Sequence, residues 1–233
     1  MQTRVLRGDG GDRPMSPGRS ADAMPCFLRR WVAKENHESL LRRELLRLHT
    51  AYAERQDHLV EATLYREHFA GREFLGVGLY DKEDDVASEA RQDLLRSLEA
   101  VERAHAEPGV RSLRIETCYE YRAIAENGTY GAAVILRTHP DHISTAVECL
   151  TPLASDVVER FAPSRVSIHH AIDDPGLFFT ICDARDPIDL SRYLGSSLLR
   201  EHHSAVGSLL VERPRWFSLD PLWHYFRRQK FAV

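Results

Sequence analysis

Two adjacent histidines, His202 and His203, are the residues of this sequence best placed to act on a ligand. They stand in "LLREHHSAVGSLL" (198–210), near the end of a predicted helix. A neutral imidazole at such a place can take up a proton, as general-base catalysis requires. The C-terminus of a helix also stabilises a cationic side chain for purely structural reasons, so a structural role for this pair stays open.

His170 lies on a predicted strand, 165–172, whose side chains point alternately to its two faces. His170 shares one face with apolar residues two and four positions before it, and we expect that face to pack against the helices. Apolar surroundings lower the pKa of an imidazole and keep it neutral near pH 7. We therefore expect His170 to meet His202 or His203 across a pocket, with one of them acting as the base. The alternative is a core histidine that bonds to a backbone carbonyl.

Asp183 and four aromatic residues complete the predicted site. Asp183 closes a predicted strand on the same face as Phe179, and its carboxylate is expected to orient a histidine. Phe179, Trp216, Trp223 and Tyr225 can stack on a flat substrate. Each also has an ordinary structural explanation, because a carboxylate at a strand end often caps a turn or helix and aromatic residues on strands are usually core.

The composition argues against several classes of function. The 31 basic and 35 acidic residues give a net charge of −4, with no basic block, so nucleic acid is not an expected partner. No apolar run approaches the roughly 20 residues that span a bilayer, and no signal peptide is recognisable, so we expect no membrane partner and a cytoplasmic location. The four cysteines are far apart, adjacent histidines point away from each other, and no H-x-x-x-H motif is present. No metal site is therefore predicted.

The same series of elements occurs twice along the chain. The expected strands are 26–33, 58–69, 72–81, 111–124, 130–138, 165–172, 177–183 and 215–228, and the expected helices are 37–56, 86–106, 142–161 and 189–203. Residues 1–24 are predicted to be a disordered tail, 25–126 a first repeat and 127–233 a second. Each repeat forms a ferredoxin-like sheet with one bare apolar face, and the two bare faces must cover each other. The predicted fold is α+β, with two tandem ferredoxin-like (βαββαβ) repeats forming a pseudo-dimeric α+β barrel.

The helix before the last strand of each repeat ends in a further pattern. "SLEAVERAHAEPGVRSL" (97–113), and more loosely "SLLREHHSAVGSLL" (197–210), resemble the antibiotic biosynthesis monooxygenase-like members of the dimeric α+β barrel superfamily. With the repeated strand order, the resemblance covers about residues 26–228. It implies a pocket between sheet and helices in each half, and oxidation of an aromatic or polyketide substrate without a metal. The unequal halves leave open whether both pockets are kept.

The predicted function is that of a small-molecule enzyme resembling cofactor-independent or flavin-assisted monooxygenases. A neutral histidine would remove a proton from a small hydrophobic or aromatic molecule, and the resulting anion would react with dioxygen directly or through reduced flavin. One alternative is a haem-binding barrel in which a helix-end histidine ligates iron. Another is a non-catalytic module whose pockets are filled by side chains. The substrate and the formation of a homodimer are left open by the sequence.

Overall fold

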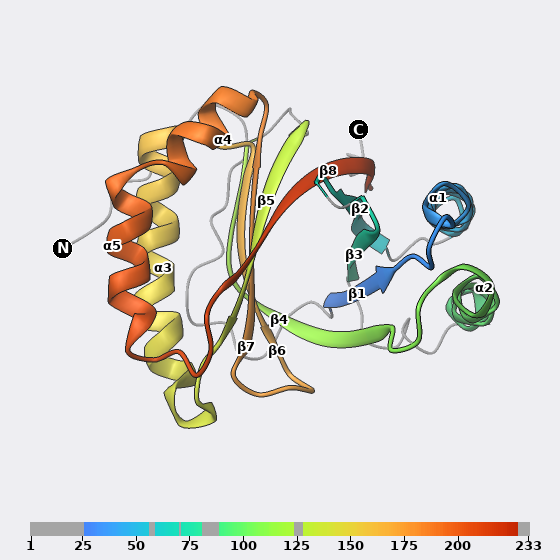
Figure 1. Ribbon diagram of the computed structural model, residues 1–233, viewed down its shortest axis with the longest axis horizontal. Coiled ribbons are helices and arrows are strands. Elements are labelled where there is room, and N and C mark those ends of the chain that lie inside the picture. Colours follow the sequence, from blue (N-terminus) through green and yellow to red (C-terminus); the bar gives the residue numbers. More distant parts are fainter. Residues whose placement is uncertain (1–25, 56–58, 70, 81–88, 124–127, 228–233) are drawn as a thin grey trace, which may run out of the picture.

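The computed structural model describes residues 26–55, 59–69, 71–80, 89–123 and 128–227 (Figure 1). The elements follow one another as β1 (Cys26–Val32), α1 (Glu38–Ala53), β2 (Leu59–Glu67), β3 (Glu73–Tyr80), α2 (Glu89–His105), β4 (Arg111–Arg122), β5 (Tyr130–Arg137), η2 (Pro140–His142), α3 (Ile143–Phe161), β6 (Arg165–Ala171), β7 (Leu177–Ala184), α4 (Pro187–Leu194), α5 (Ser197–Gly207) and β8 (Arg215–Phe226). Each predicted strand is present within a few residues of its expected bounds, and so is each predicted helix except 189–203, which is divided in two. The predicted tail and the predicted boundary at 126/127 lie outside the described residues.

The strands close into one antiparallel barrel in the order β1-β3-β2-β8-β5-β7-β6-β4. Within this ring, β4-β1-β3-β2 belong to the first repeat and β8-β5-β7-β6 to the second. Both runs have the strand order of a ferredoxin-like sheet. The predicted barrel of two tandem repeats is therefore confirmed.

The last strand of each repeat is long enough to belong to both sheets. The first part of β8 pairs with β5, and its second part pairs with β2 of the other repeat. In the same way β4 pairs first with β1 and then with β6. Side chains at the end of each repeat therefore lie over the sheet of the other repeat.

The helices cover opposite outer sides of the barrel. Helices α1 and α2 lie on one side, and α3, α4 and α5 on the other (Figure 1). In α1 the fully buried Leu41 and Leu45 lie one turn apart and pack against Trp31 of β1 and Phe74 of β3. This spacing places the apolar side chains of the helix on one face, toward the sheet.

The strands are buried on both faces, because helices cover the outside and the second sheet covers the inside. On β7, Phe178 packs among the residues under α3 to α5, whereas its neighbour Phe179 packs inside the barrel. Both rings are almost inaccessible to solvent. Apolar residues at successive positions of a strand consequently do not tell which face points to the helices.

The predicted helix 189–203 is two helices in the structure. The side chain of Asp186 accepts a hydrogen bond from the backbone N–H of Ile188 (2.7 Å) at the start of α4. After Gly195, the side chain of Ser196 accepts one from the N–H of Leu199 (3.2 Å). Because each is an N-terminal cap, the second cap marks a new helix and not a continuation of the first.

Two prolines lie within elements and have different effects. Helix α3 continues through Pro152 from Ile143 to Phe161. Strand β8 continues past Pro221, but its register against β2 shifts at this point, as is common where a proline enters a strand. Within the described ranges, no helix combines the length and apolarity needed to cross a bilayer.

Candidate functional site

Each repeat has a cavity between its sheet and its helices, and both cavities have a volume of about 70 Å³. The strand pairings relate the two. Gly76 of β3 faces Leu64 of β2 as Thr180 of β7 faces Ile168 of β6, so residues 104 positions apart correspond. The cavity under α1 and α2 is called the first cavity, and that under α3 to α5 the second cavity.

The first cavity contains groups that can carry charge or move a proton. They are His49 and Tyr52 of α1, Tyr80 of β3, Arg91 of α2 and Arg29 of β1. The rest of its wall is apolar or aromatic and includes Phe27, Trp31, Val77, Leu94, Leu98 and Trp223. A few polar groups inside an apolar cavity is the usual composition of a small-molecule site.

His49 has the geometry of a general base. Its Nδ1 lies 2.7 Å from the backbone carbonyl oxygen of Leu45. A carbonyl only accepts, so Nδ1 carries the proton and Nε2 has a free lone pair. Nε2 lies over Gly76, where a Cβ would be only 3.5 Å away. Burial lowers the pKa of His49 below its usual 6.5, so the ring is neutral at pH 7.

Two indole rings flank His49, one from each repeat. The centroid of the imidazole lies 5.9 Å from that of Trp31 and 5.8 Å from that of Trp223, both in edge-to-face arrangements. Trp31 is fixed because its Nε1–H donates to Glu102 Oε1 (2.6 Å), and Arg29 binds the same carboxylate through two hydrogen bonds (2.8 and 2.7 Å). The aromatic wall beside the base is therefore held rigidly.

Arg91 lines the first cavity among aromatic rings. Its guanidinium is 3.9 Å from the ring centroid of Phe27 and 4.9 Å from that of Tyr80. The hydroxyl of Tyr52 is buried beside Tyr80 and Arg91. Burial raises the pKa of Tyr52, so this hydroxyl keeps its proton and can donate it. Together these groups can stabilise a developing negative charge.

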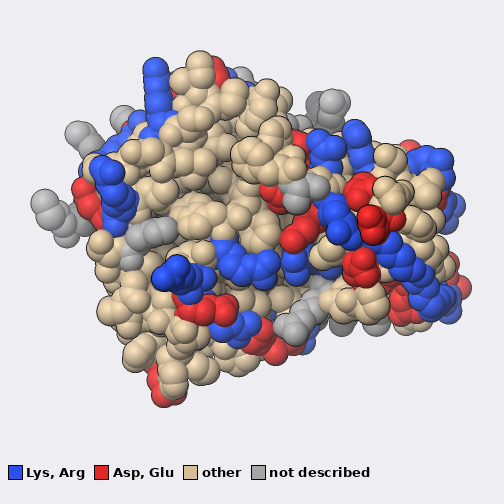
Figure 2. All heavy atoms as spheres, viewed as in Figure 1, with Lys and Arg blue, Asp and Glu red and all other residues tan. Residues whose placement is uncertain are grey.

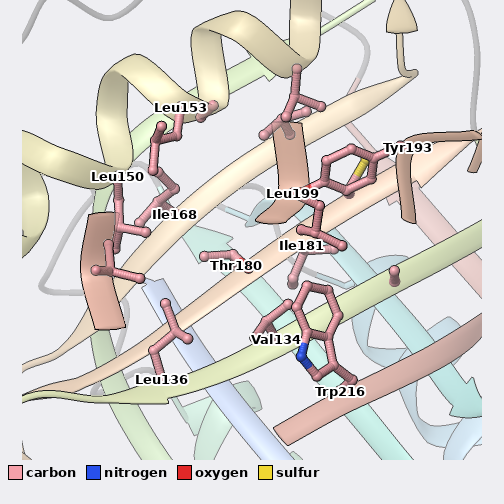
Figure 3. A pocket seen from close by; sticks show the side chains of 16 residues that line it. Val134, Leu136, Leu150, Leu153, Ile168, Thr180, Ile181, Tyr193, Leu199 and Trp216 are labelled. Carbon is pink, nitrogen blue, oxygen red and sulfur yellow. The ribbon is translucent and has the colours of Figure 1, made fainter. Parts of the chain in front are cut away.

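The second cavity is lined almost entirely by apolar side chains (Figure 3). Leu150, Leu153 and Ile168 stand on one side of it, and Tyr193 and Leu199 on another. Thr180, Tyr193 and Trp216 supply its side-chain polar atoms apart from the buried thiol of Cys182. No histidine or charged side chain belongs to the described lining of this cavity.

The predicted aromatic residues are divided between the two cavities and the barrel interior. Trp216 lines the second cavity. Trp223 lines the first, and Tyr225 stacks on Trp223 with ring centroids 6.3 Å apart. Phe179 is buried inside the barrel and reaches neither. Trp223 and Tyr225 reach the first repeat because β8 crosses from one sheet to the other.

The structure does not bring His170 and Asp183 together. His170 lies near the end of β6 against Phe178 (ring centroids 5.2 Å apart), outside the lining of the second cavity. Asp183 faces the barrel interior, on the opposite face from His170, so it cannot orient that histidine. His202 and His203 belong to α5, but their side chains lie outside the described part of the chain.

Asp183 belongs to a buried charged cluster that joins the two repeats. Its carboxylate accepts a hydrogen bond from the hydroxyl of Tyr65 on β2 (2.8 Å). Arg165 of β6 lies 3.5 Å from the same hydroxyl and 3.1 Å from Glu61 of β2. Burial raises the pKa of Asp183 to about 6, against the opposing effect of Arg165. These contacts indicate a structural role for Asp183.

The groups of the first cavity were not predicted as a site. His49 follows Leu45 by four positions and precedes Tyr52 by three, so the helical spacing already placed it on the apolar face of its helix. That position was the available signal. The sequence contained no such signal for Arg91 and Tyr80, because the contact between them depends on how α2 packs on β3. Among the described residues, no group of three or more potential ligands could hold a metal ion.

Comparisons with known proteins identify the fold. No family model and no curated protein matches this sequence. Among solved structures, a "putative monooxygenase" from Fusobacterium nucleatum has a TM-score of 0.71 and 10% identity, covering 89% of this chain and 96% of that one. An "anthrone oxidase-like protein" has a TM-score of 0.69 and 11% identity, with coverages of 91% and 97%. A "putative chlorite dismutase" has a TM-score of 0.54 and 8% identity, with coverages of 85% and 95%. The chain therefore has the fold of monooxygenase-like α+β barrel proteins.

Proposed function

We propose that the protein is an oxygen-using enzyme that oxidises a small aromatic or polyketide-like molecule in the first cavity. The observation that carries this proposal is the neutral, half-buried His49, which lines the first cavity between two indole rings and has a free lone pair on Nε2. The fold shared with an anthrone oxidase-like protein supports the class of substrate.

The chemistry begins with removal of a proton from an activated C–H group by Nε2 of His49. The resulting carbanion or enolate is electron-rich enough to reduce dioxygen, and the new C–O bond gives a peroxide anion. Return of the proton and loss of water leave a ketone. For an activated methylene the balance is R₂CH₂ + O₂ → R₂C=O + H₂O, so no external reductant is consumed.

The other groups of the first cavity have distinct roles in this proposal. Trp31 and Trp223 hold a flat ring beside His49. The positive charge of Arg91 and the hydroxyl of Tyr52 stabilise the oxygen of the enolate, whose negative charge develops only in the reaction.

Oxygen uptake with anthrone as the probe substrate tests this proposal. General-base catalysis contributes about 10²–10⁴-fold, so His49→Ala should lower kcat/KM by at least about 100-fold. His170→Ala, in the second repeat, is the matched comparison and should leave the rate unchanged. Full activity of the His49 variant, or loss of activity only in the His170 variant, would reject the first cavity as the site.

Two controls separate the remaining alternatives. Reactions with and without added reduced flavin distinguish direct use of dioxygen from flavin-assisted oxidation. An absorption spectrum of the purified protein checks the haem-binding alternative, since bound haem would give a Soret band. Such a band, together with absence of anthrone oxidation, would favour a haem-binding barrel.

A further inference from the structure

The two cavities have diverged at matched positions. The strand registers relate Arg29 to Val134 and Gly76 to Thr180. Helices α1 and α3 begin at Glu38 and Ile143, 105 positions apart, and three pairs of buried residues keep this separation, from Leu41 and Ala146 to Tyr52 and Val157. On this alignment His49 corresponds to Ala154 and Tyr52 to Val157. His49, Arg29 and Tyr52 of the first cavity are thus all replaced by aliphatic side chains in the second.

Despite this replacement, the second cavity has not been filled. Its volume equals that of the first, and small side chains such as Ala132 and Ala154 face it. Protein interiors are normally packed to the density of organic crystals, and apolar voids of this size are destabilising. A water molecule would not be stabilised in this cavity, because a buried water needs two to four polar partners and the lining is apolar. The space therefore suits an apolar ligand.

We propose that the second cavity is a separate binding site for the hydrocarbon part of an uncharged small molecule. Leu150, Leu153, Ile168 and Leu199 would surround the hydrocarbon (Figure 3). The hydroxyls of Thr180 and Tyr193 could bond to a single hydroxyl or carbonyl group of the ligand. A carboxylate or ammonium group would lose its hydration without gaining a counter-charge.

The surroundings of the second cavity agree with an uncharged ligand. On the face shown in Figure 2, charged side chains crowd over the half that contains α1 and α2, whereas the middle of the other half is largely uncharged and hollowed. Trp216, which lines the cavity, is 37% exposed and connects it to the surface. This site does not depend on the activity proposed for the first cavity.

Calorimetric titration with straight-chain alcohols from 1-butanol to 1-octanol tests the proposal. Each added methylene should tighten binding roughly fourfold until the cavity is full, with a negative heat-capacity change. Octanoate, which has the same chain length as 1-octanol but a negative charge, should bind at least tenfold more weakly than the alcohol. Absence of measurable binding up to the solubility of 1-octanol would overturn the proposal.

Matched substitutions locate the site. Ala154→Leu fills the second cavity and should weaken alcohol binding at least tenfold, whereas Ala62→Leu, in the lining of the first cavity, should leave it unchanged. Circular dichroism checks that each variant is folded, and Ala132→Val is a milder substitute if Ala154→Leu is not. The reverse pattern, with loss of binding only in the Ala62 variant, would place the apolar ligand in the first cavity and refute the inference.

Discussion

Replacing His169 with glutamine should reduce the sensitivity of the protein to acid. The His169 ring is 1% exposed inside the barrel, with Nε2 2.9 Å from the hydroxyl of Ser167 and Nδ1 3.1 Å from that of Thr117. Burial, assisted by the positive charge of Arg165, lowers the pKa of His169 from 6.5 to about 3. The folded protein therefore keeps this ring neutral where the unfolded chain binds a proton.

The magnitude follows from the difference between the two pKa values. Because the unfolded chain takes up a proton below pH 6.5 and the folded chain does so only near pH 3, stability falls as the pH falls between these values. One pKa unit corresponds to about 1.4 kcal/mol, so lowering the pH from 7 to 5 costs about 2 kcal/mol through this residue alone. Glutamine can bond to both hydroxyls and does not titrate, so the variant lacks this loss.

Urea unfolding of both proteins at pH 7, 6 and 5 measures the effect. Other titrating groups are common to the two proteins, so the comparison is between their slopes and not their absolute stabilities. The difference in unfolding free energy between pH 7 and pH 5 should be about 2 kcal/mol smaller in His169→Gln than in the parent. Parallel pH profiles would show that His169 is not held neutral, and the reasoning would be refuted.

Three further outcomes are expected. The acid limb of the kcat/KM profile should lie below pH 6.5, because burial lowers the pKa of His49, and a limb above that value would reject this histidine as the base. Tyr65→Phe should destabilise the protein by about 1–3 kcal/mol in thermal or urea unfolding, since the buried carboxylate of Asp183 loses its donor, and no loss would argue against that bond. The separated halves, cut near Gly128, should not unfold cooperatively as monomers, because each would expose a sheet face; calorimetry of each half decides this.

The fold could be predicted because local patterns of apolar and turn residues mark its helices and strands, and the same series of elements occurs twice. Leu41, Leu45 and Leu48 mark one helix, and the turn before Leu177 separates two strands. The sequence did not predict that helix 189–203 is divided at Gly195. A glycine followed by a serine can begin a new helix, but it is also compatible with one continuous helix that has a polar residue there. Local periodicity thus determines the order of elements better than their ends.

The site was predicted less well, for reasons that concern packing between distant segments. Alternation correctly placed His170 on the helix-facing side of its strand, but barrel strands are apolar on both faces, so the pattern could not show that Asp183 points the other way, into the barrel. The location of Trp223 over the first cavity depends on where β8 leaves one sheet for the other, and no local pattern records this. His49 could have been predicted as a residue that faces the sheet, because its spacing from Leu45 and Tyr52 places it on the apolar face of its helix.

The joining of both repeats in one chain has a consequence for how such a protein can change. In a symmetric dimer a single gene encodes both copies, so any substitution in one cavity also occurs in the other. Here each cavity has its own codons. The second cavity can therefore have Ala154 at the position where the first has the histidine base His49. Substitutions in the first cavity can improve a reaction while those in the second adapt it to a different ligand. Joining the repeats in one chain removes this constraint of symmetry, because a substitution in one cavity leaves the other cavity unchanged.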